Sequence, residues 1–195
     1  AMAPEAPSTF IARLKLAAAQ GDQALAISLS REFLDKNLEN RLGAEFFVGE
    51  TLAADAYQRE DYATVLDWLR ETAGESFVDP VVYEESAQVG FALRFVLPVL
   101  RRAGENARTQ EILNAAGDFM SRHEFSTPMD EWQRVRLDSL LKWQGGGGDA
   151  ALEGFVRSIK TRPPGTDWRM FLLQNPFIED LVKAPPVAEE LARHD

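Results

Sequence analysis

Residues 21–34, GDQALAISLSREFL, contain the local signals that decide the fold. Glycine commonly ends a helix, and aspartate commonly caps the helix that follows. Gly21 and Asp22 are therefore predicted to have these two roles. Apolar residues then recur at a spacing of three to four from Ala26 to Phe33. This spacing places them on one face of an amphipathic helix. The stretch therefore predicts a helix-ending turn followed by a helix with one buried face.

The same apolar period continues along nearly the whole chain on both sides of this stretch. No segment alternates apolar and polar residues over a strand's length, and no Asn-Gly or Asp-Gly pair marks a hairpin. We therefore predict an all-α fold. Pro98 interrupts the longest apolar helix, where it removes one backbone hydrogen bond and is expected to cause a kink. The other expected helices cover about 8–20, 41–59, 61–73, 81–103, 106–122, 129–144 and 149–161, with short pieces at 168–173 and beyond 177.

Acidic residues recur at the turns between the expected helices. Each is predicted to cap the helix that follows, because a carboxylate accepts hydrogen bonds from the first free N–H groups. The residue four positions later faces the preceding helix and should usually be small. The acids are Asp22, Asp61, Glu105 and Asp149, and the residues four positions later are Ala26, Val65, Thr109 and Glu153.

Two of these turns resemble the tetratricopeptide repeat. The resemblance rests on Gly21-Asp22 with Ala26, and on Ala56, Asp61-Tyr62 and Val65. It implies antiparallel helical hairpins stacked as a short right-handed superhelix, a TPR-like α-solenoid. The turn acids lie 39, 44 and 44 residues apart, whereas that family repeats about every 34 residues. The repeats are therefore interpreted as lengthened and divergent.

The end of the chain is similar to the ending of repeat regions in certain bacterial regulatory proteins. There the repeats follow an N-terminal winged-helix DNA-binding domain or another signalling domain. The prolines at the start of the chain indicate a leader or linker over 1–7, and the predicted helical repeats follow over 8–165. The second resemblance implies capping helices over 166–195 and a further domain that precedes residue 1. The residues that carry it are Trp168-Arg169, Leu172, Asn175-Pro176, Leu181, Pro185 and Leu191.

Composition excludes several classes of protein. Among 195 residues, 45% are hydrophobic and 27% are charged, which is typical of a globular domain. The chain has no cysteine, which excludes a disulfide scaffold and thiolate metal sites. The net charge of −10 disfavours direct binding of nucleic acid. No apolar run is long enough for membrane insertion. We expect a cytoplasmic location, or a periplasmic one if a transmembrane helix precedes the region.

The densest acidity lies in residues 45–85, with 11 acidic residues against two arginines. One interpretation is a solvated acidic face. The other is a surface that selects basic partners or repels DNA.

No motif indicates catalysis. His123 and His194 lack the spacing of metal ligands, and the adjacent pairs Glu84-Glu85 and Glu189-Glu190 point apart around a helix. Gly145 to Gly148 precedes an acid, which would repel phosphate, so these glycines indicate a flexible turn. We therefore expect no catalytic residues, no metal and no cofactor, and we predict that the chain is not an enzyme.

The tetratricopeptide resemblance implies that the first helix of each pair lines a concave groove. A groove with arginine and aromatic side chains is suited to a peptide carboxylate or an acidic segment. Arg101 and Arg102 could instead only complement a helix C-terminus. Trp68, Trp143 and Trp168 are expected in the core, and Trp132 is expected to be partly exposed. The predicted ligand-binding residues are Glu50, Tyr57, Arg94, Arg101, Arg102 and Lys142.

These observations favour a non-catalytic protein-interaction or ligand-sensing domain. It would form the C-terminal part of a larger bacterial transcriptional or signalling regulator and bind a protein, a peptide or a small molecule. The alternative is a helical accessory domain of an enzyme whose catalytic part lies N-terminal.

Overall fold

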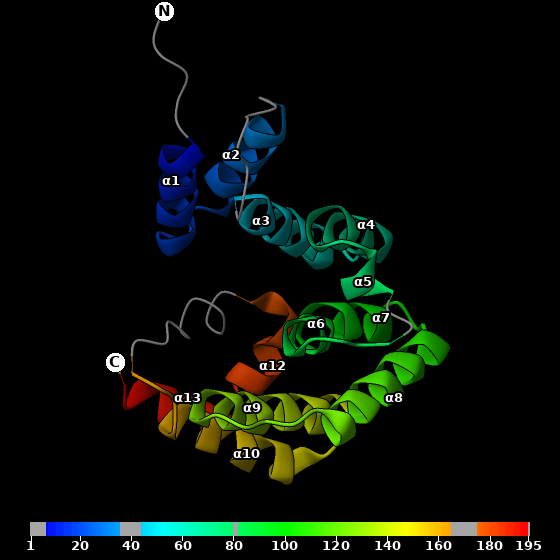
Figure 1. The fold of residues 1–195 in the computed structure, drawn as a ribbon. Coiled ribbons are helices and arrows are strands. Elements are labelled where there is room, and N and C mark those ends of the chain that lie inside the picture. Colours follow the sequence, from blue (N-terminus) through cyan, green and yellow to red (C-terminus); the bar gives the residue numbers. More distant parts are fainter. Residues whose placement is uncertain (1–6, 36–43, 80–81, 165–174, 195) are drawn as a thin grey trace, which may run out of the picture. The chain divides into compact units, whose positions relative to one another are not determined.

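The computed structural model describes residues 7–35, 44–79, 82–164 and 175–194. Every regular element in these ranges is a helix, and they contain no strand, which confirms the predicted all-α class (Figure 1). The chain divides into two compact units, Ala1–Gly74 and Glu75–Asp195. The predicted boundaries of the leader, near residue 7, and of the cap, at 165 and 166, fall at or beside residues outside the described ranges.

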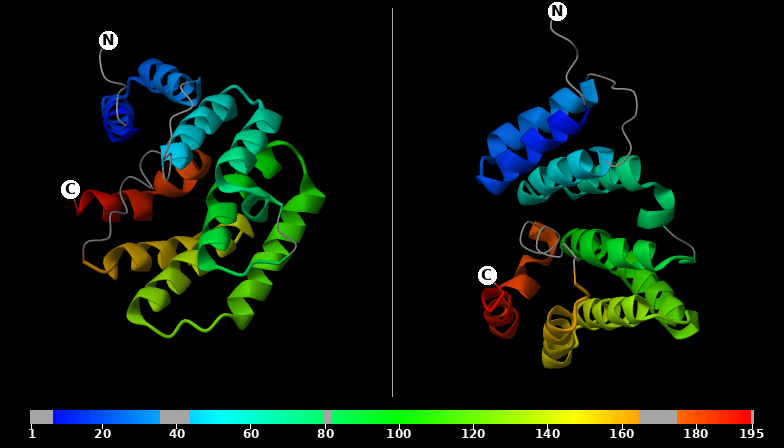
Figure 2. Two further views of the ribbon diagram at one scale, coloured as in Figure 1. Left: turned by 45° about the horizontal axis from the view of Figure 1, so that its top comes forward. Right: turned by 60° about the vertical axis from the view of Figure 1, so that its left-hand side comes forward.

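The described part of the first unit contains four helices. They are α1 (Pro7–Ala19), α2 (Gln23–Asp35), α3 (Ala44–Gln58) and α4 (Tyr62–Ala73). Each packs against the next in chain order, as both views in Figure 2 show for α1 and α2. The Phe10 and Phe33 rings lie 5.6 Å apart at the centre of the α1–α2 pair. The buried cluster around them comprises Phe10, Leu14, Ala17, Ala26, Leu29, Phe33, Val48 and Leu52.

Three inter-helix turns share one backbone geometry. In each, an N–H group donates to the carbonyl oxygen five residues earlier, which satisfies a carbonyl at the helix end. The residue before that N–H group adopts a left-handed conformation, for which glycine is best suited. The bonds are Asp22 to Ala17 (2.9 Å), Asp61 to Ala56 (3.0 Å) and Glu105 to Leu100 (2.9 Å), and the left-handed residues are Gly21, Glu60 and Gly104.

The fourth turn, between α9 and α10, has the same hydrogen-bond geometry. Its donor is Gly147, two residues before the predicted Asp149. Gly147 N–H donates to Lys142 O at 2.7 Å, and Gly146 is left-handed. The position four residues after Gly147 is Ala151, which is fully buried. The prediction placed Glu153 there, and that assignment was wrong because the glycine run, not Asp149, forms this turn.

Side-chain capping follows the prediction at two turns. Leu25 N–H donates to Asp22 Oδ1 at 3.0 Å, and Thr64 N–H donates to Asp61 Oδ1 at 3.3 Å. Glu105 does not cap its helix. Its carboxylate instead accepts a hydrogen bond from Arg108 Nη1 at 3.2 Å.

The other helices of the described residues belong to the second unit. The ranges predicted near 106–122, 129–144 and 149–161 are confirmed to within one residue. The helix predicted over 81–103 is present from Ser86 to Arg102, so it begins later than predicted, and its middle part is the π-helical segment η1. The elements are α5 (Glu75–Val78), α6 (Ser86–Phe91), η1 (Ala92–Val96), α7 (Leu97–Arg102), α8 (Asn106–Arg122), α9 (Pro128–Gln144), α10 (Gly148–Lys160), η2 (Pro176–Ile178), α12 (Glu179–Val182) and α13 (Pro185–Ala192).

Pro98 is accommodated by the π-helical segment η1. Pro98 has no N–H group, and its ring would crowd a carbonyl one turn earlier in an α-helix. In η1 the turn is wider, and Leu97 N–H donates to Ala92 O, five residues back. The predicted interruption of this apolar helix is therefore present as a change of helix type.

The segment formed by α6 and η1 packs against α9 in the same direction. Residues later in the α6–η1 segment contact residues later in α9, as is expected when two helices pack in parallel. A Cβ on Gly90 would lie only 3.3 Å from Leu137 Cδ2, so glycine permits a close approach. The pairs are Ser86 with Gln133 (Oγ to Oε1, 3.1 Å), Gly90 with Leu137, and Leu93 with Gln144 (O to Nε2, 2.9 Å).

The C-terminal elements pack against earlier helices of the same second unit. η2 contacts η1 and α7, and α13 contacts α10. The Phe177 ring meets the Phe95 ring edge to face, with centroids 5.6 Å apart. Trp168, which the sequence places in the cap, lies outside the described residues. The buried side chains of this segment are Phe177, Ile178, Leu181, Val187 and Leu191.

Candidate functional site

Two arginines from neighbouring helices of the second unit approach each other. Arg94 lies in η1 and Arg136 in the middle of α9, and these elements are packed together. Burial, and then the nearby positive charge of Arg94, lower the pKa of the Arg136 guanidinium to about 10. Two positive charges that lie close together in a partly buried environment repel each other, so the proximity of Arg94 to Arg136 is energetically unfavourable.

Arg136 has no carboxylate partner among the described residues. Its Nε is buried and has no hydrogen-bond acceptor there. The guanidinium carbon lies 4.8 Å from the centre of the Trp132 ring, an arrangement that stabilises a cation against an aromatic face. Arg136 as a whole remains partly exposed.

Trp132 supports Arg136 from a rigid position. Its Nε1 donates to Ser158 O at 2.7 Å, a carbonyl in the last turn of α10 that lacks a helical donor. Trp132 is 7% exposed, so the expectation that it would be partly exposed was wrong. The start of α9 is covered because it packs against the end of α10.

Arg94 is also held in place by its own surroundings. Its Nε donates to Gly90 O at 2.9 Å, and its guanidinium carbon lies 5.1 Å from the centre of the Phe95 ring. Gly90 is the residue that lets α6 approach α9 closely. Both guanidinium groups are therefore positioned by aromatic rings and backbone before any ligand arrives. A fixed pair of guanidinium groups can bind an oxyanion with charge-assisted hydrogen bonds.

The other predicted residues of the second unit lie elsewhere on its helices. Arg101 and Arg102 are exposed in the last turn of α7, and burial of part of Arg101 lowers its pKa. Lys142 Nζ lies 2.6 Å from Asp138 Oδ2 on the exposed side of α9. The prediction that Arg94 and Arg101 share a face assumed an unbroken α-helix. η1 changes the helical register on which that spacing depends.

The remaining predicted residues belong to α3 of the first unit. Tyr57 is half-buried, and its ring meets the Tyr62 ring edge to face at 5.9 Å. Glu50 lies within α3, and its side chain is outside the described residues. The two units are described separately, so Glu50 and Tyr57 cannot be assigned to the arginine pair.

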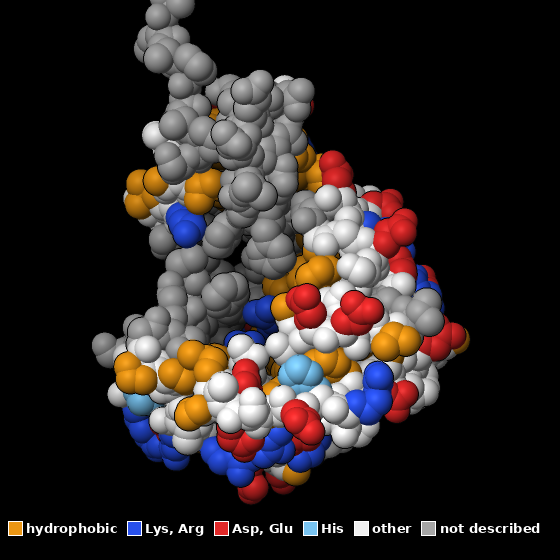
Figure 3. All heavy atoms as spheres, in the orientation of Figure 1, with side chains coloured by type: hydrophobic (Ala, Val, Ile, Leu, Met, Phe, Trp, Pro, Cys, Tyr) orange, Lys and Arg blue, Asp and Glu red, His pale blue; other side chains and the backbone are white. Residues whose placement is uncertain are grey.

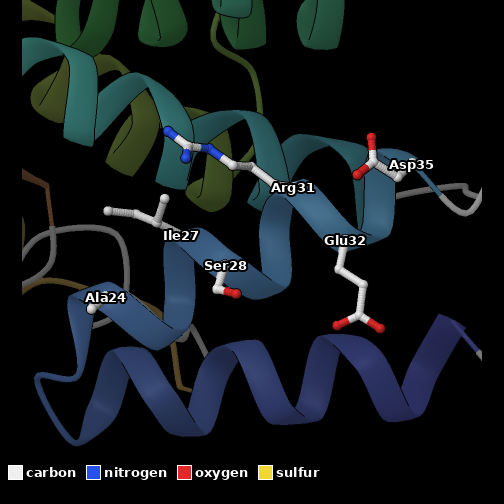
Figure 4. A pocket seen from close by; sticks show the side chains of 6 residues that line it. All are labelled: Ala24, Ile27, Ser28, Arg31, Glu32 and Asp35. Carbon is white, nitrogen blue, oxygen red and sulfur yellow. The ribbon is translucent and has the colours of Figure 1, made fainter.

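A pocket is present in the first unit, on the outer side of α2 (Figure 4). All of its lining side chains come from successive turns of this one helix. It is a shallow depression with mixed charge, and it has no converging set of polar groups. The lining residues are Ala24, Ile27, Ser28, Arg31, Glu32 and Asp35.

Within the described ranges, no group of three or more His, Asp or Glu side chains is placed to hold a metal ion. In the same ranges, no helix combines the length and the apolar character needed to cross a membrane. Comparison with known proteins finds no family model, no curated protein and no solved structure that matches the chain.

Sequence reasoning missed Arg136. One signal was available, because Trp132 and Arg136 are four residues apart and such residues are neighbours on a helix. Its proximity to Arg94 could not be inferred, since the two are 42 positions apart in the chain (136 − 94). Only the packing of η1 against α9 brings them together.

Proposed function

We propose that this chain is a non-catalytic interaction domain that binds an acidic peptide or protein segment. The observation that carries the proposal is Arg136, whose half-buried guanidinium lies against the Trp132 ring and lacks a carboxylate partner in the described residues. A buried or half-buried cation without a counter-ion is destabilising, and an anionic ligand would relieve this cost. The domain would serve a larger bacterial regulatory protein.

The proposed architecture is a divergent TPR-like array of helical hairpins with a C-terminal cap. Four turns with one hydrogen-bond geometry support it, at Asp22, Asp61, Glu105 and Gly147. The parallel packing of α6 and η1 on α9 also supports it, since stacked hairpins bring first helices together in the same direction. In this arrangement, Arg94 and Arg136 belong to the first helices of successive pairs.

A selection from a random peptide library tests the function. Immobilised wild-type chain should enrich peptides that contain Asp or Glu, and synthetic copies should bind with micromolar dissociation constants. Mass spectrometry should find the peptides chemically unchanged after hours with the protein. Failure to enrich any peptide, or conversion of a peptide to product, would overturn the proposal.

A matched pair of variants tests the location of the binding. Arg136→Ala should weaken binding of the selected peptides, because it removes the guanidinium that has no carboxylate partner in the described residues. Arg134→Ala is the control, since Arg134 is exposed on α9 and already paired with Glu131 at 2.6 Å. Equal losses in the two variants would indicate a diffuse charge effect in place of a site.

A further inference from the structure

The last helix of the second unit, α13, is anchored by few side chains. It has eight residues, and its buried side chains are Val187, Glu190 and Leu191. It packs against α10 and α12 (Figure 1). A helix this short is not stable by itself in water, so α13 depends on its docking for its structure. One of the three anchors is a carboxylate, which is costly to bury unless it is paired.

Three basic side chains surround the Glu190 carboxylate, which is only 4% exposed. Arg193 Nη1 donates to Oε2 at 2.7 Å, and His194 Nε2 lies 3.1 Å from Oε1. Both residues lie within four positions of Glu190 in the chain, so these contacts do not join α13 to another helix. Lys160 Nζ, at 3.5 Å from Oε2, comes from the end of α10. Among the described residues, Lys160 is therefore the cation that ties Glu190 to a neighbouring helix.

The other charged groups described on the neighbouring helices do not pair with Glu190. Lys183 on α12 is paired with Glu179 of the same helix, and Arg157 on α10 acts on Glu131 of α9. The remaining acids of these three helices are exposed. They are Asp149 and Glu153 on α10, Asp180 on α12 and Glu189 on α13.

We propose that α13 is an acid-released latch, in which protonation of Glu190 removes its ion pair with Lys160 and α13 detaches from α10 while the rest of the second unit stays folded. The proton comes from solvent and neutralises the carboxylate. Val187 and Leu191 then remain as the buried anchors, and detachment exposes both. Local opening of this kind occurs in the least stable parts of a protein, where few apolar contacts hold a segment. The inference does not depend on the proposed peptide binding.

The direction of the pH effect follows from the surroundings of Glu190. Burial raises the pKa of this carboxyl, but the hydrogen bonds from His194 and Arg193 and the charge of Lys160 outweigh burial and lower it below its ordinary value of 4.5. Once α13 is detached, Glu190 returns to its ordinary pKa. Docking is therefore fully favoured above about pH 4.5 and weakens as pH falls through the lower pKa of the docked state.

Amide hydrogen exchange of the wild-type full chain tests the proposal, with α8 as the internal reference. The exchange rates are divided by the intrinsic rate at each pH, which gives a protection factor for each helix. We expect the protection of α13 to fall several-fold between about pH 7 and about pH 3, while that of α8 is unchanged. Equal losses in α13 and α8 would mean that the whole unit unfolds, and would overturn the proposal. Protection of α13 that does not change with pH would also overturn it.

Three variants identify the groups responsible. Glu190→Gln should lower the protection of α13 at pH 7 and remove its pH dependence, because the amide has no charge and does not titrate. Glu189→Gln is the control and should behave as the wild type, since Glu189 is exposed. Lys160→Met should also lower the protection of α13 at pH 7, because it removes the charge but keeps an apolar stem.

Two results with these variants would refute the latch. One is unchanged protection of α13 in Lys160→Met, and the other is a wild-type acid response in Glu190→Gln. A matching loss in Glu189→Gln would assign the effect to general charge and would refute it as well. Because the wild-type measurement needs no variant, a poorly folded variant leaves the test intact.

Discussion

Gln144 of α9 donates a hydrogen bond from Nε2 to the carbonyl oxygen of Leu93 in η1, at 2.9 Å and in a buried position. The π-helical segment creates the need for this bond. Leu97 N–H reaches past Leu93 to Ala92 O, and Pro98 has no N–H to donate. A side chain from another helix therefore satisfies a carbonyl that the backbone leaves open.

Replacing Gln144 should destabilise the second unit. Gln144→Leu leaves the buried Leu93 carbonyl without a donor, which costs about 1–3 kcal/mol of unfolding free energy. Chemical denaturation monitored by circular dichroism measures it. Gln110→Leu is the control, because Gln110 is exposed on α8 and should change stability by no more than about 0.5 kcal/mol. Equal stability of the two variants would contradict this account of η1.

Gly154 should not tolerate alanine. A Cβ at this position would lie 2.4 Å from Ser139 Oγ, where α10 crosses α9. Gly154→Ala should therefore cost about 1–3 kcal/mol through overpacking. Gly117→Ala is a matched control in α8, with nothing within 4 Å of the added carbon, and should raise stability by up to about 1 kcal/mol. A stabilised Gly154→Ala variant would show that the two helices are not closely packed there.

The C-terminal segment should be required for a stable second unit. Phe177 is buried against Phe95, so Phe177→Ala should cost about 3–5 kcal/mol. Deleting residues 166–195 should cause aggregation or a large fall in melting temperature, because it exposes the apolar surface against which Phe177 and the later buried side chains pack. Met129→Ala, at an exposed position, serves as the control in thermal melts. A truncated chain that remains soluble with unchanged melting temperature would disprove the capping role.

Stability should depend on Glu190 at acidic pH. Burial raises the pKa of this carboxyl, but hydrogen bonds from His194 and Arg193 and the charge of Lys160 outweigh burial and lower it overall. A depressed folded-state pKa stabilises the protein above the unfolded-state value, about 4.5. That contribution is lost as pH falls through the lower folded-state value.

Urea unfolding from pH 7 to pH 3 measures this dependence. Glu190→Gln should flatten the loss of stability below about pH 4.5, since the amide does not titrate. Glu189→Gln, at the exposed neighbouring position, should retain the wild-type profile. Indistinguishable profiles for Glu190→Gln and the wild type would exclude this carboxylate as the source.

Duplex DNA should not bind to the chain. The net charge is −10, and on the face drawn in Figure 3 the basic side chains are interspersed with acidic ones. On this face a phosphate backbone therefore meets no continuous basic stripe. An electrophoretic mobility shift assay at low salt should show free DNA at all protein concentrations. A shift that disappears when salt is added would prove the prediction wrong.

Local chemistry explains where sequence reasoning succeeded. Helix ends at Gly21 and Gly104 depend on a left-handed residue and a nearby acceptor, which are properties of a few consecutive residues. The apolar period of α8, α9 and α10 is equally local, and their bounds were predicted to within one residue. The fourth turn was misplaced because four consecutive glycines offered more than one left-handed position.

The sequence by itself determined the all-α class, most helix boundaries and the absence of cysteine chemistry. Tertiary structure alone decided which polar groups are buried and what each one meets. Arg136 resembles any surface arginine in the sequence, and it became a candidate site because α9 packs against η1 and places it near Arg94. The same packing places Gln144 where its side chain donates to the buried Leu93 carbonyl. Burial and pairing depend on contacts between distant residues, whereas helix period and turn chemistry depend on neighbours in the chain.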